Sequence, residues 1–293
     1  MHRTRHLLPL SLLLFTAWLA PPARAQQISY HRVEQSTLEE RLKGSARKNS
    51  ERRAKLHTLF ETAGCKGEAL SEPPVKDSSQ PNVVCRLAGD SDSVIVVGAH
   101  FDLVEEGQGV VDNWSGAALL PSLFESLNGK PRRHTFVFIG FTDEEKGLVG
   151  SEQFVKKLTP EERSKIQAMI NLDSLGLSST KVWLSRADKG LATALYSVAN
   201  AMKLPLAAVN VEQVGSSDSE SFAKRKIPSL TIHSVTQETL PILHSAKDTL
   251  AAIHPDDYYA TYRLVAAYLS YLDQKLATEK RSEERRVGKE CRL

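Results

Sequence analysis

The sequence has few cysteines, no excess of charge of one sign and no hydrophobic run long enough to span a membrane. Three cysteines in 293 residues exclude a disulfide-rich miniprotein, and 16 glycines with 13 prolines exclude collagen. The 38 basic residues nearly balance the 35 acidic ones, and 41% of residues are hydrophobic, which excludes an acidic disordered chain. Because neither an internal repeat nor a long Pro-, Gly- or Ser-rich linker divides the chain, we expect one domain with an ample core.

The first 25 residues have the three parts of a secretory signal peptide. Arg3 and Arg5 precede an apolar run at 10–20, and the small residues of Ala-Arg-Ala at 23–25 end the segment. The alternative is a transmembrane anchor, which would need an apolar run of about 20 residues. We therefore expect residues 1–25 to be cleaved off and the protein to be secreted or periplasmic, with no stable membrane anchor.

The last 13 residues, 281–293, have no apolar face. The last helical pattern is expected to stop near Glu279 and Lys280, so a solvated, disordered tail is one interpretation of the segment beyond them. A second interpretation is that the string RSEERRVGKEC resembles the translation of a common sequencing-adapter oligonucleotide, which would make it an assembly artefact. Resequencing the locus distinguishes the two.

The net charge of +3 comes from the two ends of the chain. Residues 1–25 and 281–293 hold eight of the 38 basic residues and three of the 35 acidic ones, so residues 26–280 carry about −2. This balance predicts no nucleic-acid partner. The tail also holds Cys291, which leaves Cys65 and Cys85 as a disulfide candidate in an oxidising compartment; two buried free thiols are the alternative.

Short apolar runs alternate with longer amphipathic segments from residue 81 onward. Before them, residues 28–63 are rich in Glu, Arg, Lys and Leu and predict one or two N-terminal surface helices. The pattern predicts buried strands at 94–99, 134–141, 166–172 and 229–233, and helices at 116–127, 148–158, 191–202 and 255–276. Such alternation is typical of an α/β fold, here a single domain with a mostly parallel central sheet and helices on both faces.

Carboxylate and imidazole side chains follow the predicted strands, where ligands bind in such folds. They are His100, Asp102, Glu144, Glu145, Asp173 and His244, and Asp112 opens the helix after the first strand. Each one alone has a simpler explanation, such as a turn residue or a charge at a helix N-terminus. Together, so much negative charge in a partly dry cleft would repel itself without a cation. Imidazole and carboxylate without thiolate suit zinc or a similar divalent ion, and two such ions would need a shared ligand.

Five motifs resemble, in order and spacing, those of the M28 zinc peptidases of the bacterial leucyl aminopeptidase type. They are His100-x-Asp102, Asp112-Asn113-x-Ser115-Gly116, Glu144-Glu145-x-Gly147-Leu148-x-Gly150-Ser151, Asn171-Leu172-Asp173 and His244-Ser245-x-x-Asp248. The resemblance covers 81–276, the expected catalytic core of a peptidase domain at 26–280. It implies a zinc-peptidase/phosphorylase-like fold and a secreted metallopeptidase that hydrolyses peptides, in the first place an aminopeptidase.

The resemblance also implies two zinc ions per chain. Asp112 would bridge them, His100 and Asp173 would complete the ligands of one ion, and Glu145 and His244 those of the other.

The same resemblance implies the catalytic roles. Glu144 would act as general base, taking a proton from a metal-bridged water and passing it to the leaving amine. Asp102 would accept the N–H of the His100 imidazole and fix its tautomer. Asp248 would act similarly near His244 or serve as a turn residue.

Three positions depart from the family pattern. Trp114 stands where relatives often have Ala or Gly, so its ring either shapes the substrate pocket or packs in the core. Asp218 is followed by Ser219 instead of the histidine of Ser-Asp-His-x-x-Phe. We assign Trp114 and Asp218 to the substrate pocket. Residues 213–217 also lack a tyrosine that some aminopeptidases place near the oxyanion, so the sequence does not identify the residue that stabilises the oxyanion.

Two other functions fit the same resemblance. Glutaminyl cyclases share the architecture but use one zinc ion and transfer an acyl group rather than hydrolyse, and they usually differ after the first aspartate, where this chain keeps Asn113-x-Ser115-Gly116. Non-catalytic relatives serve as binding ectodomains and have typically lost metal ligands, whereas all five are present here.

Overall fold

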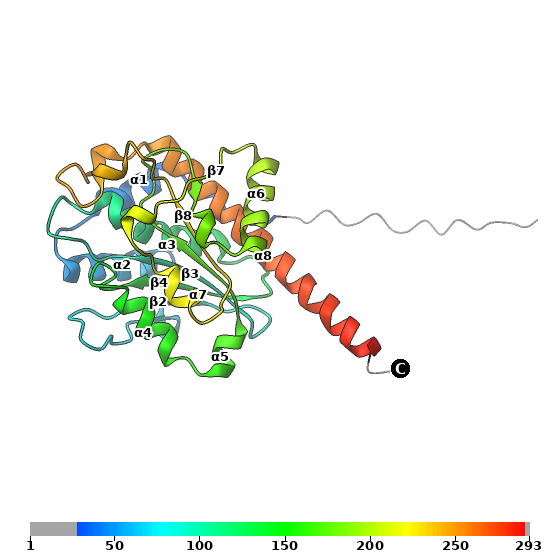
Figure 1. Cartoon of the computed structure of the whole chain (residues 1–293). Coiled ribbons are helices and arrows are strands. Elements are labelled where there is room, and N and C mark those ends of the chain that lie inside the picture. Colours follow the sequence, from blue (N-terminus) through cyan, green and yellow to red (C-terminus); the bar gives the residue numbers. More distant parts are fainter. Residues whose placement is uncertain (1–27, 291–293) are drawn as a thin grey trace, which may run out of the picture.

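An eight-stranded mixed sheet runs through the centre of the molecule (Figure 1). The computed structural model of the chain describes residues 28–290. The strand order is β1-β2-β4-β3-β5-β8-β6-β7. The strands are β1 (Leu70–Ser71), β2 (Val83–Leu87), β3 (Val94–His100), β4 (Thr135–Phe141), β5 (Ile166–Leu172), β6 (Lys181–Val182), β7 (Ala207–Ala208) and β8 (Ser229–His233). The four central strands β4, β3, β5 and β8 are mutually parallel, whereas β2 and β6 run antiparallel to them, which confirms the predicted mostly parallel sheet.

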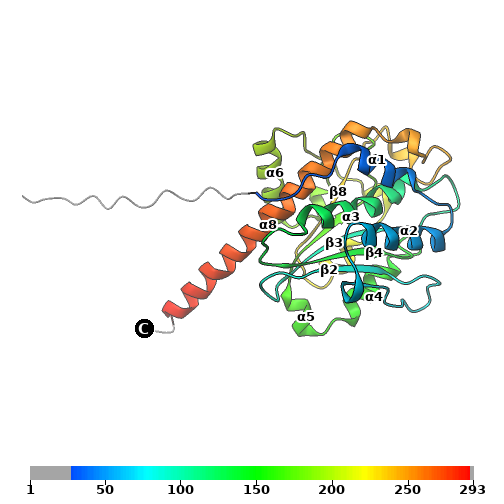
Figure 2. The same cartoon turned by 180° about the vertical axis from the view of Figure 1, so that it is seen from behind.

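Helices cover both faces of this sheet, as the sequence predicted. They are α1 (Gln35–Lys43), α2 (Asn49–Thr62), α3 (Ser115–Leu127), α4 (Val149–Lys157), α5 (Pro160–Lys165), α6 (Lys189–Met202), α7 (Ser219–Ala223) and α8 (Pro255–Glu290). Figure 2 shows α1, α2, α3 and α8 in front of one face. Helices α4, α5 and α7 lie on the opposite face, where α7 and α5 contact β5.

Side chains of the central strands alternate between two apolar cores. In β4, Phe136 and Phe138 pack into the larger core, beside Phe60 of α2 and Phe124 of α3. The intervening residues of β4 face the smaller core under α4 and α7. Successive side chains of a strand point to opposite faces, so a strand buried on both faces reads as a continuous apolar run. This is why the four central strands could be predicted almost to the residue.

The N-terminal helices α1 and α2 belong to the domain core rather than only to its surface. They contact α3, and they bury Leu38, Leu42, Leu56 and Phe60 in the larger apolar core. The sequence predicted one or two surface helices in this segment, and the structure has two; α2 also carries a fully buried charged residue, Arg52.

The last helix is longer than predicted. We expected it to end near residue 276 and a disordered tail to begin at 281, but the structure continues α8 to Glu290. The added segment is rich in Glu, Arg and Lys, which have high helix propensity, so it forms helix without an apolar face. The predicted signal peptide at 1–25 and Cys291 lie outside the described residues.

A disulfide bond joins Cys65, just after α2, to Cys85 in β2, as the sequence predicted. It fixes the end of the N-terminal helical layer to the sheet. In the part of the chain that the structure describes, no helix combines the length and the apolar character needed to cross a membrane.

Candidate metal centre and active site

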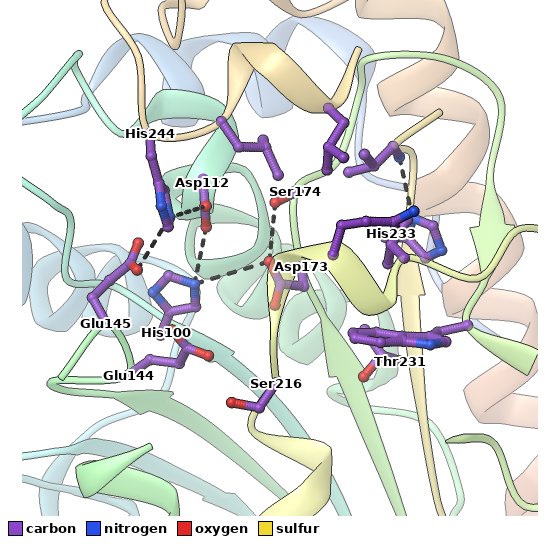
Figure 3. A pocket seen from close by; sticks show the side chains of 16 residues that line it. His100, Asp112, Glu144, Glu145, Asp173, Ser174, Ser216, Thr231, His233 and His244 are labelled. Atoms are coloured by element: carbon purple, nitrogen blue, oxygen red, sulfur yellow. Dashed lines mark hydrogen bonds and ion pairs between the residues drawn. The ribbon is translucent and has the colours of Figure 1, made fainter. Parts of the chain in front are cut away.

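The carboxyl ends of β3, β4 and β5 bring the predicted carboxylates and imidazoles together (Figure 3). His100 is the last residue of β3, and Asp173 directly follows β5. Glu144 and Glu145 follow β4, and His244 comes from the loop after β8. These residues share one edge of the sheet because the strands that carry them are parallel.

Asp112 lies at the centre of the cluster, with a different histidine at each of its oxygens. Its Oδ1 is 3.2 Å from Nε2 of His100, and its Oδ2 is 3.1 Å from Nε2 of His244. His244 Nε2 is also 3.2 Å from Glu145 Oε2, and His100 Nε2 is 3.9 Å from Asp173 Oδ1. Asp112 is therefore shared by two groups of candidate ligands.

Both groups have the dimensions of a metal site. In each, His100–Asp112–Asp173 and Asp112–Glu145–His244, the ligand atoms lie within 4.8 Å of one another. A third group, His100–Glu144–Glu145, is equally compact. His100 and Asp112 are buried, whereas the side chain of His244 is 50% exposed, so the cluster is open to solvent on the His244 side.

The cluster carries more negative charge than its surroundings can stabilise. Burial and the charges of neighbouring carboxylates raise the pKa of Glu144 to about 10. Burial also raises the pKa of Asp173 to about 6, with a further contribution from Asp112. Burial opposes the ionisation of Asp112 as well, but hydrogen bonds to the two histidines hold its pKa well below the usual range. A divalent cation is the group that would relieve this repulsion.

Asp102 binds the backbone of the two glutamates. Its Oδ1 accepts the N–H of Glu144 at 3.1 Å, and its Oδ2 accepts the N–H of Glu145 at 3.2 Å. Oδ1 also lies 3.5 Å from Nδ1 of His100, an ion-pair distance rather than a hydrogen bond. Asp102 thus lies beside His100 without the expected hydrogen bond to its imidazole, and it holds the segment after β4.

Asp248 contacts Asp112 rather than His244. Its carboxylate accepts the backbone N–H of Val111 at 2.6 Å and that of Asp112 at 3.2 Å. Among the described residues no hydrogen bond joins Asp248 to His244. Asp248 therefore holds the turn that carries the shared carboxylate, a role that its position in the sequence did not indicate.

The Asp-Asn-x-Ser-Gly motif brings the start of α3 against the end of β5. The buried amide of Asn113 donates to Leu172 O at 2.8 Å and accepts the N–H of Gly116 at 2.9 Å and that of Ser174 at 3.2 Å. A Cβ on Gly116 would lie 2.5 Å from Leu172 O, so only glycine permits this approach. The motif consequently sets the distance between Asp112 and Asp173.

Three residues in or directly beside the cluster have a left-handed backbone. They are Asp143, Ser174 and His244, with φ of 51°, 53° and 54°. Non-glycine residues in this region cost free energy and persist where the surrounding structure requires them, commonly at functional sites.

A cavity of about 260 Å³ opens onto the cluster. Beyond the cluster, the cavity is lined largely by loops that follow β6, β7 and β8. The apolar side chains among these residues, called the apolar wall below, are Trp183, Val211, Val235, Leu240 and Leu243. No sequence pattern marks these residues, because isolated apolar residues in loops have no periodicity.

Trp114 and Asp218 do not line this cavity, in contrast to the prediction. The indole of Trp114 is fully buried and donates its Nε1–H to Arg41 O at 2.9 Å, so the ring packs between α3 and the N-terminal helices. Asp218 is fully buried at the start of α7, and Ser216 lines the cavity instead.

His233, at the end of β8, is held in its neutral form. Its Nδ1 accepts the N–H of Val235 at 3.1 Å, and its Nε2–H donates to Val209 O at 2.9 Å. Only the neutral imidazole fits both bonds. Burial accordingly lowers the pKa of His233 to about 4.

We predict that His233 destabilises the fold in acid. The unfolded chain protonates this histidine near pH 6.5 and the native state only near pH 4, so protons favour unfolding between these values, by up to about 3 kcal/mol. Urea denaturation at pH 7 and pH 4.5 should therefore show a smaller loss of stability for His233→Gln than for the wild type. An equal loss of stability in the variant and the wild type would contradict the conclusion that His233 destabilises the fold in acid.

The chain matches known proteins in sequence. A family model described as "Peptidase family M28" matches residues 82–269. The chain is 39% identical over 102 residues to an aminopeptidase of Pseudomonas aeruginosa, a match that covers 34% of this chain and 19% of that protein.

Two solved structures are similar in fold. A zinc aminopeptidase from Bacillus subtilis superposes with a TM-score of 0.60 and 25% identity, over 65% of this chain and 49% of that one. A glutaminyl cyclase from an Acidobacteriales bacterium has a TM-score of 0.71 and 19% identity, over 87% of this chain and 100% of that one. The chain thus spans about a fifth of the Pseudomonas protein and about half of the Bacillus enzyme.

Proposed function

The chain belongs to peptidase family M28, and from this premise we propose that it is a zinc-dependent aminopeptidase that removes N-terminal residues from peptides. The observation that carries the proposal is the position of Asp112, which presents one oxygen to His100 and the other to His244. A carboxylate shared in this way is what a two-metal site requires.

The side chains present fit two zinc ions. His100, Asp112 and Asp173 would hold one, and Asp112, Glu145 and His244 the other. All are nitrogen or carboxylate oxygen donors, which zinc accepts. Glu145 Oε1 is buried without a hydrogen-bond partner among the described residues, as expected of an atom reserved for a ligand.

The residues around the metal centre would transfer the proton of the attacking water. Zinc, when bound, polarises the scissile carbonyl and makes water more acidic. The carboxylate of Glu144 would take the proton of the attacking water and deliver it to the leaving amine. Asp102 orients Glu144 through its backbone N–H, and Ser217 orients Asp173 by donating to its Oδ2 at 2.9 Å.

The charge of the cluster supports cleavage at the amino end of a peptide. Five carboxylates converge here, from Asp102, Asp112, Glu144, Glu145 and Asp173. The carboxylates of Asp112, Glu144, Glu145 and Asp173 line the cavity, where they would attract the α-ammonium group of a peptide and repel its α-carboxylate. A panel of aminoacyl chromogenic substrates tests the proposal, and we expect a peptide with a blocked N-terminus to resist cleavage.

We also propose that the protein acts outside the cytoplasm. The signal-peptide pattern at 1–25 and the Cys65–Cys85 disulfide support this, since disulfides persist in oxidising compartments.

Glutaminyl cyclase activity is the second candidate. Its support is the fold similarity, which extends over the whole length of a solved cyclase at 19% identity. A cyclase of the kind expected from the sequence would use one zinc ion, whereas the second histidine at Asp112 supports two. Incubating the protein with a peptide that begins with glutamine distinguishes the two: hydrolysis releases free glutamine, and cyclisation releases ammonia.

We propose that the apolar wall of the cavity accepts a large apolar N-terminal side chain. Trp183 is its largest member, and its ring is held by the guanidinium of Arg186, 4.4 Å from the ring centroid. Burying an aromatic or leucyl side chain against this wall would stabilise bound substrate by about 1 to 3 kcal/mol.

Replacement of Trp183 by alanine should change substrate preference. We expect kcat/KM for leucyl and phenylalanyl substrates to fall by about 10- to 100-fold, with alanyl substrates affected far less. The neighbouring Leu184 is 41% exposed and lies outside the cavity lining, so Leu184→Ala is the matched control and should behave as wild type. An equal loss on all substrates in Trp183→Ala would argue against a specificity role.

A further inference from the structure

Arg52 is a buried cation that lies behind the candidate metal centre. It comes from α2, outside the residues that the family model matches, and none of its side chain is exposed. Its ring partner is Trp114, whose centroid lies 5.3 Å from the guanidinium carbon. Among the described residues no carboxylate forms an ion pair with Arg52.

The guanidinium donates to backbone carbonyls instead. Its Nε donates to Phe101 O, Nη1 donates to Gln108 O at 3.2 Å and to Ala46 O at 3.3 Å, and Nη2 donates to Gly109 O at 2.7 Å. The planar guanidinium of arginine can donate hydrogen bonds to several carbonyl groups at once. The ammonium group of a lysine, at the end of a flexible side chain, cannot reproduce this arrangement.

Three of these carbonyls belong to the segment 101–109, which connects His100 to the turn of Asp112. Phe101 is adjacent to His100, and Gly109 lies three residues before Asp112. The segment has no regular secondary structure of its own. Further anchors of the segment are Asp248, whose backbone oxygen accepts the N–H of Gln108 at 2.8 Å, and Phe141, whose backbone oxygen accepts the N–H of Phe101 at 2.9 Å. Arg52 therefore fixes both ends of the segment that separates the two central ligands.

The charge of Arg52 acts on the same region. Burial lowers its pKa to about 10, against the attraction of Asp102, Asp248, Asp112 and Glu145. The group stays protonated at neutral pH, so it contributes a fixed positive charge on the protein side of the carboxylate cluster. This charge stabilises the ionised carboxylates, which is the form that binds a metal.

We propose that Arg52 is a positioning residue that sets the spacing of His100 and Asp112 and thereby determines zinc affinity and kcat. The inference rests on the proposed function, because the segment that Arg52 holds carries the proposed ligands. It assigns to the N-terminal helices a part in catalysis, beyond their contribution to the apolar core.

The test compares Arg52→Lys and Arg52→Gln with Arg41→Lys. Arg41 is a matched control: it is also buried, at 8% exposure, lies on the neighbouring helix α1, and donates to Ser122 Oγ and Glu125 Oε2 on α3 instead of to the 101–109 segment. For each protein we would measure urea stability, zinc affinity by competition with a chromophoric chelator, and kcat and KM at saturating zinc.

We expect both Arg52 variants to fold and to bind zinc about 10- to 100-fold more weakly than the wild type. Their kcat at saturating zinc should fall by about 10-fold or more, with KM changed by less than about threefold. Arg41→Lys should lose stability only. If the wild type bound no zinc, the proposed function would fail; if it bound zinc and the Arg52 variants matched it, only the present inference would fail. Loss of folding in both Arg52 variants, or equal effects in Arg41→Lys, would also overturn the inference, because the role would then be purely structural.

Discussion

Replacing Glu144 by glutamine is expected to lower kcat by about 10²- to 10⁴-fold while leaving the zinc content unchanged. Glutamine keeps the shape of the side chain but cannot accept the proton of the attacking water. The backbone N–H of residue 144 still reaches Asp102, so the segment after β4 should stay in place. Stopped assays with a leucyl substrate, together with elemental analysis of the same preparation, measure both quantities.

Glu106 provides the control for this substitution. It is an exposed glutamate on the segment between His100 and Asp112. Glu106→Gln makes the same chemical change in the segment between two proposed ligands without touching the proposed base, and it should retain wild-type kcat. Nearly full activity of the Glu144→Gln variant would rule out Glu144 as the general base. Loss of zinc from this variant would instead indicate that Glu144 is a metal ligand.

Replacing Asp112 by asparagine is expected to weaken zinc binding at both sites, by at least about 100-fold at each. Asp112 is the one residue that both ligand groups share, and the amide nitrogen of asparagine cannot coordinate zinc as a carboxylate oxygen does. The substitution leaves the backbone N–H of residue 112, which Asp248 binds, unchanged. The fold should therefore persist, and circular dichroism with zinc titration would show a folded protein that no longer retains metal.

Asp173→Asn is the matched comparison, because Asp173 belongs to only one of the two groups that contain Asp112. We expect this variant to keep one zinc ion held by Asp112, Glu145 and His244. If Asp112→Asn also kept one ion with unchanged affinity, Asp112 would not be shared, and the two-metal arrangement would be abandoned.

The parts of the fold that could be predicted are the strands whose residues are almost all buried. The strands at 94–100 and 166–172 are largely buried on both faces, so their residues are mainly apolar, and a proposed ligand stands at the end of each strand or directly after it. His100 and Asp173 could be assigned to one site because the parallel sheet places its strand ends together.

The parts that could not be predicted depend on contacts between distant segments. Asp248 binds the turn of Asp112 rather than His244, because the loop after β8 folds back over the start of α3. Trp114 turns into the core because α1 and α2, which the sequence pattern indicated only as surface helices, cover that side of α3. The cavity wall around Trp183 is made by three separate loops, and no local pattern specifies how they meet.

The length of α8 was misjudged for a different reason. The prediction required an apolar face for a helix to continue, whereas the helix propensity of Glu, Arg and Lys is sufficient to extend one that is already formed.

Elemental analysis of the purified, active protein tests the central claim most directly. The position of Asp112 between His100 and His244 predicts close to two zinc ions per chain at full activity, with activity lost on chelation and restored by zinc. A protein that is fully active with one zinc ion per chain would contradict the two-metal account.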